Sequence, residues 1–168
     1  GNEKENEETM MLAKQYLVED HGVTAMDLAG AEALFPTEKY LGLFEKAKAM
    51  GIPFTVHAGE AAGPESVRAA IQTGTKRIGH GVRSTEDESV VEQIRDRGIT
   101  LEMCPTSNRQ THAIPDMKQY PLIPFLESGI RVTVNTDDMG IERTCLSKEF
   151  EYLRREFGLT KAQEKKLL

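Results

Sequence analysis

The stretch IPFTVHAGEAAGPESVRAAIQTGTKRIGHG, residues 52–81, contains a complete strand–helix–strand pattern. Segments 52–60 and 76–81 are short with apolar centres, which indicates strands. Between them Pro64 can open a helix and Gly74 can close it. A helix between two strands predicts a βαβ unit, in which the strands pair in parallel through a right-handed crossover.

The alternation of strand and helix continues on both sides of this unit, with a period of two to three dozen residues. We expect helix N-caps at Thr37, at Ser84 or Thr85 and at Ser147, and a capping box that begins at Thr160. Strands are expected at residues 22–30, 52–60, 76–81, 99–108 and 130–138, and helices at about 5–20, 36–51, 64–74, 84–98, 123–129, 147–158 and from 160 onward.

Two α/β architectures fit this alternation: a doubly wound sheet and a (β/α)8 TIM-type barrel. A barrel gathers its active site from the carboxyl ends of several strands, whereas a doubly wound sheet concentrates it at one switch point. No Gly-rich phosphate-binding motif follows any expected strand. The barrel is favoured because every expected strand ends in chemically functional residues: Asp27 to Gly30, His57 to Glu60, His80, Ser107 to Asn108, and Asp137 to Asp138.

Composition restricts the class of protein and partner. The 168 residues, 39% hydrophobic and 29% charged, suit one soluble globular domain. A formal net charge of −6 argues against nucleic acid or an anionic membrane as partner and favours a small molecule. Cys104 and Cys145 form no metal or redox motif, and no segment reads as a signal peptide or a membrane span. We therefore expect a cytoplasmic protein in a reducing compartment.

The segments HAGE and GHG carry residues suited to catalysis, and each also has a structural explanation. His57 and Glu60 could act on a substrate, or they could be a buried histidine bonded to a backbone carbonyl and a glutamate favoured at a helix start. His80 lies between two glycines, which let the backbone approach a ligand closely or simply form a tight bend. Neither segment decides the question alone.

Two later segments leave similar alternatives. In CPTSN, residues 104–108, a structural turn is favoured, with Pro105 fixing the chain, Asn108 capping it and Cys104 in the core. In VTVNTDD, residues 132–138, the adjacent acids are either a solvated turn or part of a metal site or proton relay. His21 and His112 receive no role, since one lies near a helix C-terminus and the other in a proline-containing surface loop.

Taken together these residues predict a site, because two histidines, a glutamate and two aspartates fall at the same end of a parallel sheet. One histidine with one aspartate is a partial ligand set suited to zinc. A glutamate and a second histidine nearby supply a proton donor and a proton acceptor.

The motifs MDLAGAE, VHAGE, RIGHGV, LEMCPTSNRQT and VTVNTDD resemble, in order and at similar spacing, those of the adenosine deaminase family. That family belongs to the zinc amidohydrolase-type barrels, and the resemblance extends from about Glu8 to the end of the chain. The DLAG and CPTSN segments are more similar to the adenosine-specific branch than to adenine deaminases. The resemblance implies hydrolytic deamination of adenosine and 2′-deoxyadenosine to inosine and ammonia, as in purine salvage.

The resemblance also implies roles for individual residues. Glu60 would protonate N1 of the purine while hydroxide attacks C6, and His80 would orient the attacking water and help take its proton. The zinc ligands would be His57 and Asp137, so the neighbouring acid is free for the substrate. The base would be held at N7 by Asp138 and at N3 by the Gly30 backbone N–H.

The sequence departs from the family pattern in one respect. The family carries an H-x-H pair of zinc ligands on its first strand, and no H-x-H occurs here. We therefore expect residues 1–168 to be the C-terminal part of a single barrel domain, supplying strands four to eight, truncated at both ends. The expected partners are a purine nucleoside and either the missing N-terminal half or another copy of the chain. Two alternatives stay open: a deaminase of another 6-aminopurine, and a non-catalytic half-barrel.

Overall fold

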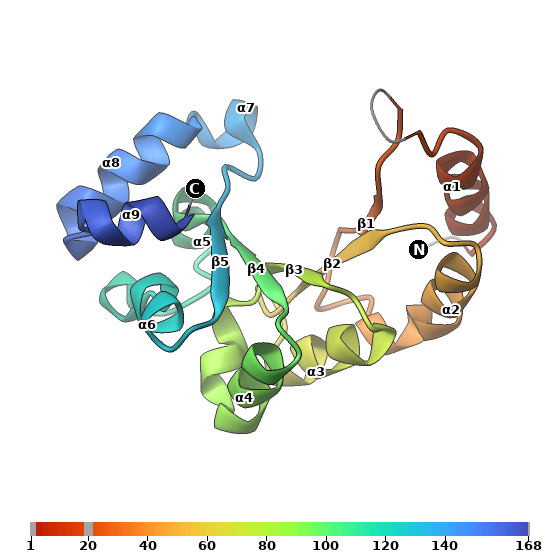
Figure 1. The fold of residues 1–168 in the computed structure, drawn as a ribbon, viewed down its shortest axis with the longest axis horizontal. Coiled ribbons are helices and arrows are strands. Elements are labelled where there is room, and N and C mark those ends of the chain that lie inside the picture. Colours follow the sequence, from red (N-terminus) through yellow and green to blue (C-terminus); the bar gives the residue numbers. More distant parts are fainter. Residues whose placement is uncertain (1–2, 19–21, 168) are drawn as a thin grey trace.

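The computed structural model describes residues 3–18 and 22–167 and contains a five-stranded parallel sheet. The strands lie side by side in chain order, β1-β2-β3-β4-β5 (Figure 1). A doubly wound sheet would change strand order at a switch point, so the sequential order is that of a barrel. The strands are β1 (Met26–Leu28), β2 (Phe54–Ala58), β3 (Arg77–His80), β4 (Thr100–Met103) and β5 (Arg131–Val134).

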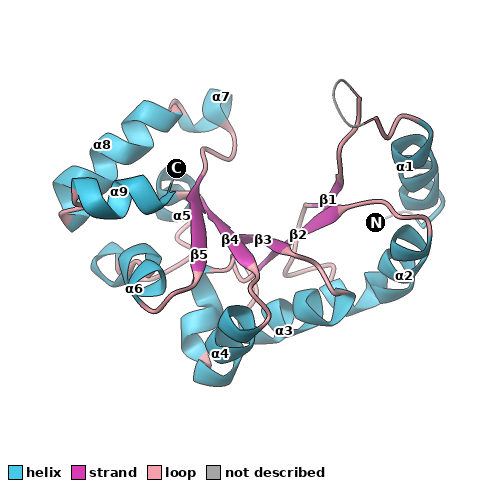
Figure 2. Cartoon of the chain, viewed as in Figure 1, coloured by secondary structure: helices cyan, strands magenta, loops and turns pink. Residues whose placement is uncertain are grey.

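Helices cover the convex side of the sheet, and the two ends of the chain lie on opposite sides of the molecule (Figures 1 and 2). Among the described residues, no helix combines the length and apolar character needed to cross a bilayer. The α-helices are α1 (Glu3–Gln15), α2 (Leu41–Ala49), α3 (Pro64–Thr73), α4 (Glu88–Asp96), α5 (Pro105–Gln110), α6 (Leu122–Glu127), α7 (Met139–Glu142), α8 (Leu146–Phe157) and α9 (Lys161–Leu167), and the 3-10 helices are η1 (Thr37–Tyr40), η2 (Val82–Glu86) and η3 (Met117–Gln119).

The two faces of the sheet differ because side chains alternate along each strand. One row of neighbours is apolar: Val56 pairs with Ile78, Ile78 with Leu101, and Leu101 with Val132, all of them buried in the main core. Burying each such side chain contributes about 1.5–3 kcal/mol. The next row, on the opposite face, is His57, Gly79, Glu102 and Thr133. The helices therefore pack on the apolar face, and the concave face carries polar groups.

The expected fold class is confirmed: the chain is a parallel α/β structure that supplies five βα units of a TIM-type barrel. Gly74 ends α3 in the left-handed conformation, with φ of 79°. The capping box also forms, since Gln163 N donates to Thr160 Oγ1 and Thr160 N donates to Gln163 Oε1. The predicted strands were several residues too long at their ends, where the polar residues leave the sheet.

Three predicted N-caps were wrong. Thr37 is buried inside η1 and its hydroxyl lies 3.3 Å from Ser66 Oγ. Residues 82–86 form η2, so α4 starts later and Asp87 caps it by accepting from Ser89 N. The helix expected from Ser147 begins instead at Leu146, after Cys145 and without a side-chain cap. In each case the local sequence predicted a hydroxyl residue as the N-cap, but the residue before the helix in the structure is a different one nearby.

Two further expectations concern single segments. The helix expected over about 5–20 ends at Gln15, and His21 lies outside the described residues. The expected strand over residues 99–108, with a turn at 104–108, is wrong in detail. Strand β4 ends at Met103, and Pro105 begins helix α5. Pro105 suits the first helical position because its missing N–H would have no partner there. Asn108 therefore lies within a helix and is fully buried, not at a cap.

Candidate active site

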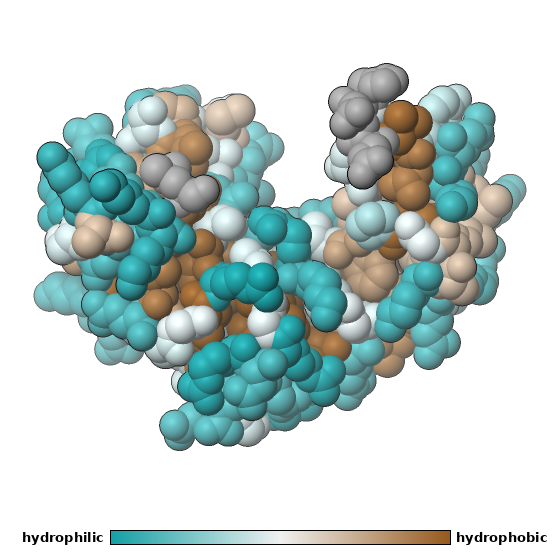
Figure 3. Space-filling view, in the orientation of Figure 1, coloured by the Kyte–Doolittle hydropathy of each residue, from teal (hydrophilic) through white to brown (hydrophobic). Residues whose placement is uncertain are grey.

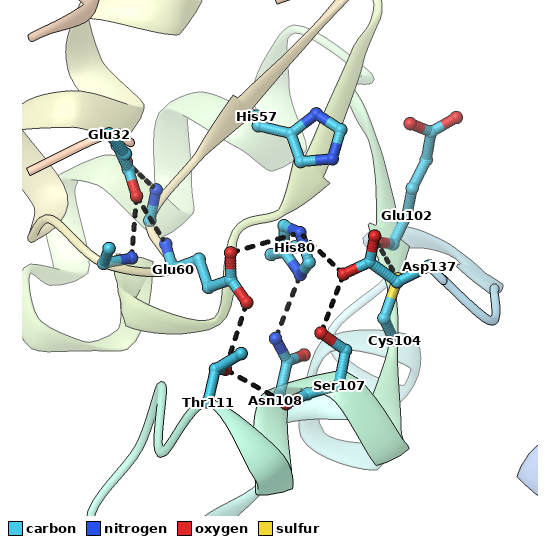
Figure 4. Close-up of polar contacts among 12 residues, drawn as sticks. Glu32, His57, Glu60, His80, Glu102, Cys104, Ser107, Asn108, Thr111 and Asp137 are labelled. Carbon is cyan, nitrogen blue, oxygen red and sulfur yellow. Dashed lines mark hydrogen bonds and ion pairs between the residues drawn. The ribbon is translucent and has the colours of Figure 1, made fainter. Parts of the chain in front are cut away.

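Four of the residues expected at the strand ends, His57, Glu60, His80 and Asp137, meet in one place (Figure 4). Each of His57, His80 and Asp137 offers one ligand atom, and these atoms all lie within 4.8 Å of one another. The Nε2 atom of His80 is 3.5 Å from a carboxylate oxygen of Glu60 and 3.8 Å from one of Asp137. A cavity of about 310 Å³ at this point is lined by His57, His80 and Asp137, among others. The concave side of the molecule is hollowed between its two ends (Figure 3).

Two of these residues have an unusual backbone conformation. His80 has φ of 61° and Asp137 has φ of 57°, both in the left-handed region. Such conformations cost about 1–3 kcal/mol each and cluster at functional sites, although His and Asp tolerate them better than most residues. Gly79 is needed for a different reason, because a Cβ there would lie 3.0 Å from Cγ of His57. The absence of a side chain at Gly79 leaves room for the imidazole ring.

His57 is paired with a carboxylate. Its Nδ1 lies 3.0 Å from Asp27, which projects from the neighbouring strand β1. Burial opposes protonation of His57, but the hydrogen bond and charge of Asp27, together with Asp137 and Glu60, raise its pKa above the usual value. A carboxylate on Nδ1 holds the proton there and leaves the lone pair of Nε2 for a metal.

His80 has a different environment. It is 1% exposed, and its Nδ1 lies 3.0 Å from Nδ2 of the buried Asn108. The Tyr120 hydroxyl donates in turn to Oδ1 of Asn108 at 3.0 Å. Burial lowers the pKa of His80, and this effect outweighs the attraction of its proton to Glu60 and Asp137.

The short helix α5 contacts three of the site residues. Ser107 Oγ donates to Asp137 at 2.7 Å, Asn108 meets His80, and Thr111 Oγ1 donates to Glu60 at 3.1 Å. These contacts were not anticipated, because the segment was interpreted as a turn. The signal that could have found them is Pro105, which starts a helix and places the polar residues that follow on its first turns.

Glu32 is a second residue that sequence reasoning missed. It follows β1, and its carboxylate accepts four backbone N–H groups from the loop after β2, at 2.6, 3.1, 2.7 and 3.0 Å. The donors are Gly59, Glu60, Ala61 and Ala62. Ionised acceptors make hydrogen bonds about twice as strong as neutral ones, so this carboxylate fixes the loop that carries Glu60. A lone glutamate has no sequence signal for such a role.

The remaining expected residues lie around the site. Gly30 has φ of 131° and lines a hollow of about 250 Å³ together with His57. Asp138 is exposed, and one of its oxygens accepts from Gly140 N and Ile141 N, each at 3.0 Å. That oxygen caps α7, so the expected contact of Asp138 with a substrate stays a prediction.

Two other expectations agree with the structure. Cys104 is buried in the core, and burial raises the pKa of its thiol. His112 is exposed, as expected for a surface loop.

The donor atoms fit zinc in chemical type, since Zn²⁺ takes imidazole nitrogen and carboxylate oxygen. The pairing of Asp27 with His57 Nδ1 is an independent sign, because metal-binding histidines almost always donate their other ring N–H to such a group. His57 and Asp137 would supply two ligands, where catalytic zinc sites use three protein ligands or more.

Comparison with known proteins gives one consistent family. The sequence model of the adenosine deaminase family matches residues 1–168. An adenosine deaminase of Haemophilus ducreyi is 48% identical over 168 residues, which are 99% of this chain and 49% of the relative. The chain thus spans about half the length of the curated relatives it matches.

Solved structures share the fold. An N6-mAMP deaminase of Arabidopsis is 26% identical with a TM-score of 0.86, over 97% of this chain and 48% of that one. An amidohydrolase of Burkholderia ambifaria, solved with bound zinc, has a TM-score of 0.81 over 96% of this chain and 46% of that one, and at 21% identity the likeness is one of fold alone.

Proposed function

The chain belongs to the adenosine deaminase family, and on that premise we propose that it carries one side of the active site of a zinc-dependent nucleoside deaminase. The reaction would convert adenosine or 2′-deoxyadenosine and water into the inosine product and ammonia, in purine salvage. The observation that carries the proposal is the meeting of His57, Glu60, His80 and Asp137 at the carboxyl ends of three strands, β2, β3 and β5. In barrels, that end of the strands is where active sites lie.

Zinc held by His57 and Asp137 would supply the Lewis acidity that makes hydroxide available near neutral pH. Glu60 would donate a proton to ring nitrogen N1 of the purine, which removes electron density from C6 and makes it electrophilic. The oxygen of the attacking water would then add to C6, and the C6–N bond would break as the amino group takes up the second proton of that water and leaves as ammonia, while the first proton ends on N1. His80 would orient the attacking water for this addition.

The surroundings of Glu60 support its role as the acid. Its backbone is fixed through Glu32, and its carboxylate is oriented by the Thr111 hydroxyl. A group held in this way can face a substrate with little reorganisation, which is the requirement for efficient proton transfer. For the base itself, we propose the Gly30 backbone N–H at N3 and Asp138 at N7.

We propose further that the other half of the barrel supplies the H-x-H zinc ligands, from the same protein or from another chain. The curated relatives are about twice as long as this chain, and no H-x-H occurs in residues 1–168. Residues 1–168 would then be part of a single barrel domain. We place the protein in the cytoplasm, because Cys104 and Cys145 are both free thiols.

A second candidate is a deaminase of another 6-aminopurine, since the chain also shares its fold with an N6-mAMP deaminase. The third is a non-catalytic half-barrel. All three are separated by one experiment. Adenosine, adenine and N6-methyl-AMP are offered to the chain alone and to an equimolar mixture with a segment that carries the H-x-H strand, and turnover is followed by absorbance.

We expect the chain alone to bind zinc poorly and to turn over none of the substrates at a useful rate, because half of the ligand set is absent. The mixture should bind zinc and prefer adenosine. Preference for another substrate would favour the second candidate. A mixture that binds zinc without turnover would favour the third, and robust zinc-dependent turnover by the chain alone would contradict the need for a second half.

A further inference from the structure

A chain of hydrogen bonds runs from His80 into the protein core. His80 Nδ1 lies 3.0 Å from Asn108 Nδ2, and Asn108 Oδ1 accepts from the Tyr120 hydroxyl at 3.0 Å. The three residues are 1%, 0% and 3% exposed, so water does not compete for these bonds. His80 comes from the end of β3 and Asn108 from α5 (Figure 4). The roles proposed above use His80 alone, and Asn108 and Tyr120 have none.

The direction of each bond follows from its atoms. An amide NH₂ group only donates, so His80 Nδ1 must accept and carries no proton. An amide oxygen only accepts, so Tyr120 donates. A neutral imidazole that accepts at Nδ1 has its proton on Nε2.

The other side of the ring gives the same result independently. Nε2 of His80 faces a carboxylate oxygen of Glu60 at 3.5 Å and one of Asp137 at 3.8 Å. If the Asn108 amide were rotated to present its oxygen, the single proton of the neutral ring would have to lie on Nδ1. The lone pair of Nε2 would then face two negative groups, which is unfavourable. An N–H at Nε2 is attracted to both. The amide at one end and the carboxylates at the other therefore select the same tautomer.

We propose that Asn108, anchored by Tyr120, is a positioning residue that holds His80 in the Nε2–H tautomer, so that His80 meets the reacting oxygen as a hydrogen-bond donor. This deepens the proposed function and rests on it. The neutral ring then offers no lone pair at Nε2, so His80 orients the water and the carboxylates around it receive the proton. The Nε2–H tautomer also means that His80 is not a metal ligand, since a donor N–H cannot coordinate zinc.

The tautomer can be measured without any assay of activity. The full-length protein is labelled with ¹⁵N-histidine, and the His80 signals are assigned by their absence in the His80→Gln variant. We expect an unprotonated Nδ1 and a protonated Nε2. A protonated Nδ1 in the wild-type protein overturns the proposal, whatever the enzyme does.

Three variants then test whether the tautomer matters for turnover. Asn108→Asp replaces the donor by a group that only accepts, so Nδ1 must gain a proton. We expect kcat to fall about 10²–10⁴-fold, the usual contribution of a positioned proton-transfer group, with KM and zinc content close to wild type. Tyr120→Phe keeps the ring and removes one hydrogen bond, which should lower kcat about fivefold. Tyr16→Phe, at an exposed tyrosine that follows α1, is the matched control and should leave kcat unchanged.

The outcomes separate this inference from the proposed function. A folded Asn108→Asp variant with wild-type kcat overturns the inference, and so does a Tyr120→Phe variant with wild-type kcat and tautomer. If Asn108→Asp fails to fold, Tyr120→Phe and the ¹⁵N signals still decide. If the full-length wild-type protein has no deaminase activity, the proposed function fails, and the ¹⁵N signals alone decide whether Asn108 sets the tautomer.

Discussion

His57 and His80 end neighbouring strands, and their ring centroids are 5.0 Å apart, yet their surroundings are opposite. The Nδ1 atom of His57 meets the carboxylate of Asp27, whereas Nδ1 of His80 meets the amide of Asn108. The pKa of His57 is raised by its acidic neighbours in spite of burial, and burial lowers the pKa of His80.

The difference teaches that the partner on one ring nitrogen decides what the other can do. A carboxylate on Nδ1 leaves a lone pair at Nε2, which is the form that binds metal. An amide donor on Nδ1 leaves an N–H at Nε2, which is the form that donates to an oxygen. In the proposed function, two identical side chains in one site therefore receive different roles from the residues behind them.

The largest expected effect comes from substitution of Glu60, a carboxylate that acts on both histidines. Glu60 faces His80 and contributes to the raised pKa of His57. Glu60→Gln in the complete enzyme should lower kcat about 10²–10⁴-fold, because an amide cannot supply the proton for N1. Zinc content should stay at the wild-type level, since metal is assigned to other residues. Steady-state kinetics and metal analysis measure both.

Glu92→Gln is the matched control for that variant, because Glu92 is exposed on the outer helix α4. It should leave kcat unchanged. Near-normal turnover in Glu60→Gln would show that Glu60 is not the acid.

The same contrast shows how far sequence reasoning reaches. The fold and the meeting of His57, His80 and Asp137 could be predicted, because parallel strands in sequential order bring their carboxyl ends to one rim. The residues behind them could not. Asn108 lies in a segment that local sequence favours as a turn, and its role depends on a helix start and on a tyrosine packed against it.

Glu32 makes the same point on the other side of the site. Its function depends on four backbone N–H groups that converge from the loop after a different strand. Backbone N–H groups are present at every residue except proline, so no pattern of side chains announces their convergence. Only three-dimensional structure shows it.

The next expected effect tests the partner of His57. Asp27→Ala removes both the hydrogen bond and the charge at Nδ1, and should weaken zinc binding about 10–100-fold, the usual cost of losing such a partner. Asp27→Asn can still accept through its amide oxygen and should lose less. Competition with a chelator measures zinc affinity in the complete enzyme. Equal zinc affinity in both variants and wild type would mean that Asp27 does not orient His57 for metal.

A smaller effect is expected from Glu32, whose carboxylate holds the loop between β2 and β3. Glu32→Gln replaces an oxygen by an NH₂ group that cannot accept, so part of the set of four N–H bonds is lost. Because Glu60 is still present, we expect kcat to fall about fivefold, equivalent to one lost hydrogen bond. Glu38→Gln, at an exposed glutamate of η1, is the control. A normal kcat in Glu32→Gln would show that Glu60 is positioned without the four hydrogen bonds that Glu32 accepts.

The smallest effect, and the most direct test of the comparison, concerns pH and stability in the zinc-free protein. His57 has a raised folded pKa, so its contribution to stability is fully present below pH 6.5 and is lost as the pH rises through the folded pKa. His80 has a lowered folded pKa, so the unfolded chain binds its proton more readily. Its contribution is therefore present above pH 6.5 and is lost as the pH falls from 6.5 through the folded pKa.

Urea midpoints measured across this pH range should thus separate the two histidines. His57→Gln should remove the loss of stability on the alkaline side of pH 6.5, and His80→Gln should remove the loss on the acid side. His112→Gln, at an exposed histidine, controls for the substitution itself. If both site variants remove the loss of stability on the same side of pH 6.5, the two rings share one environment. The assignment of His57 to metal and His80 to water would then be wrong. Opposite sides would mean that the carboxylate of Asp27 and the burial of His80 give equal side chains different protonation before any zinc or substrate is bound.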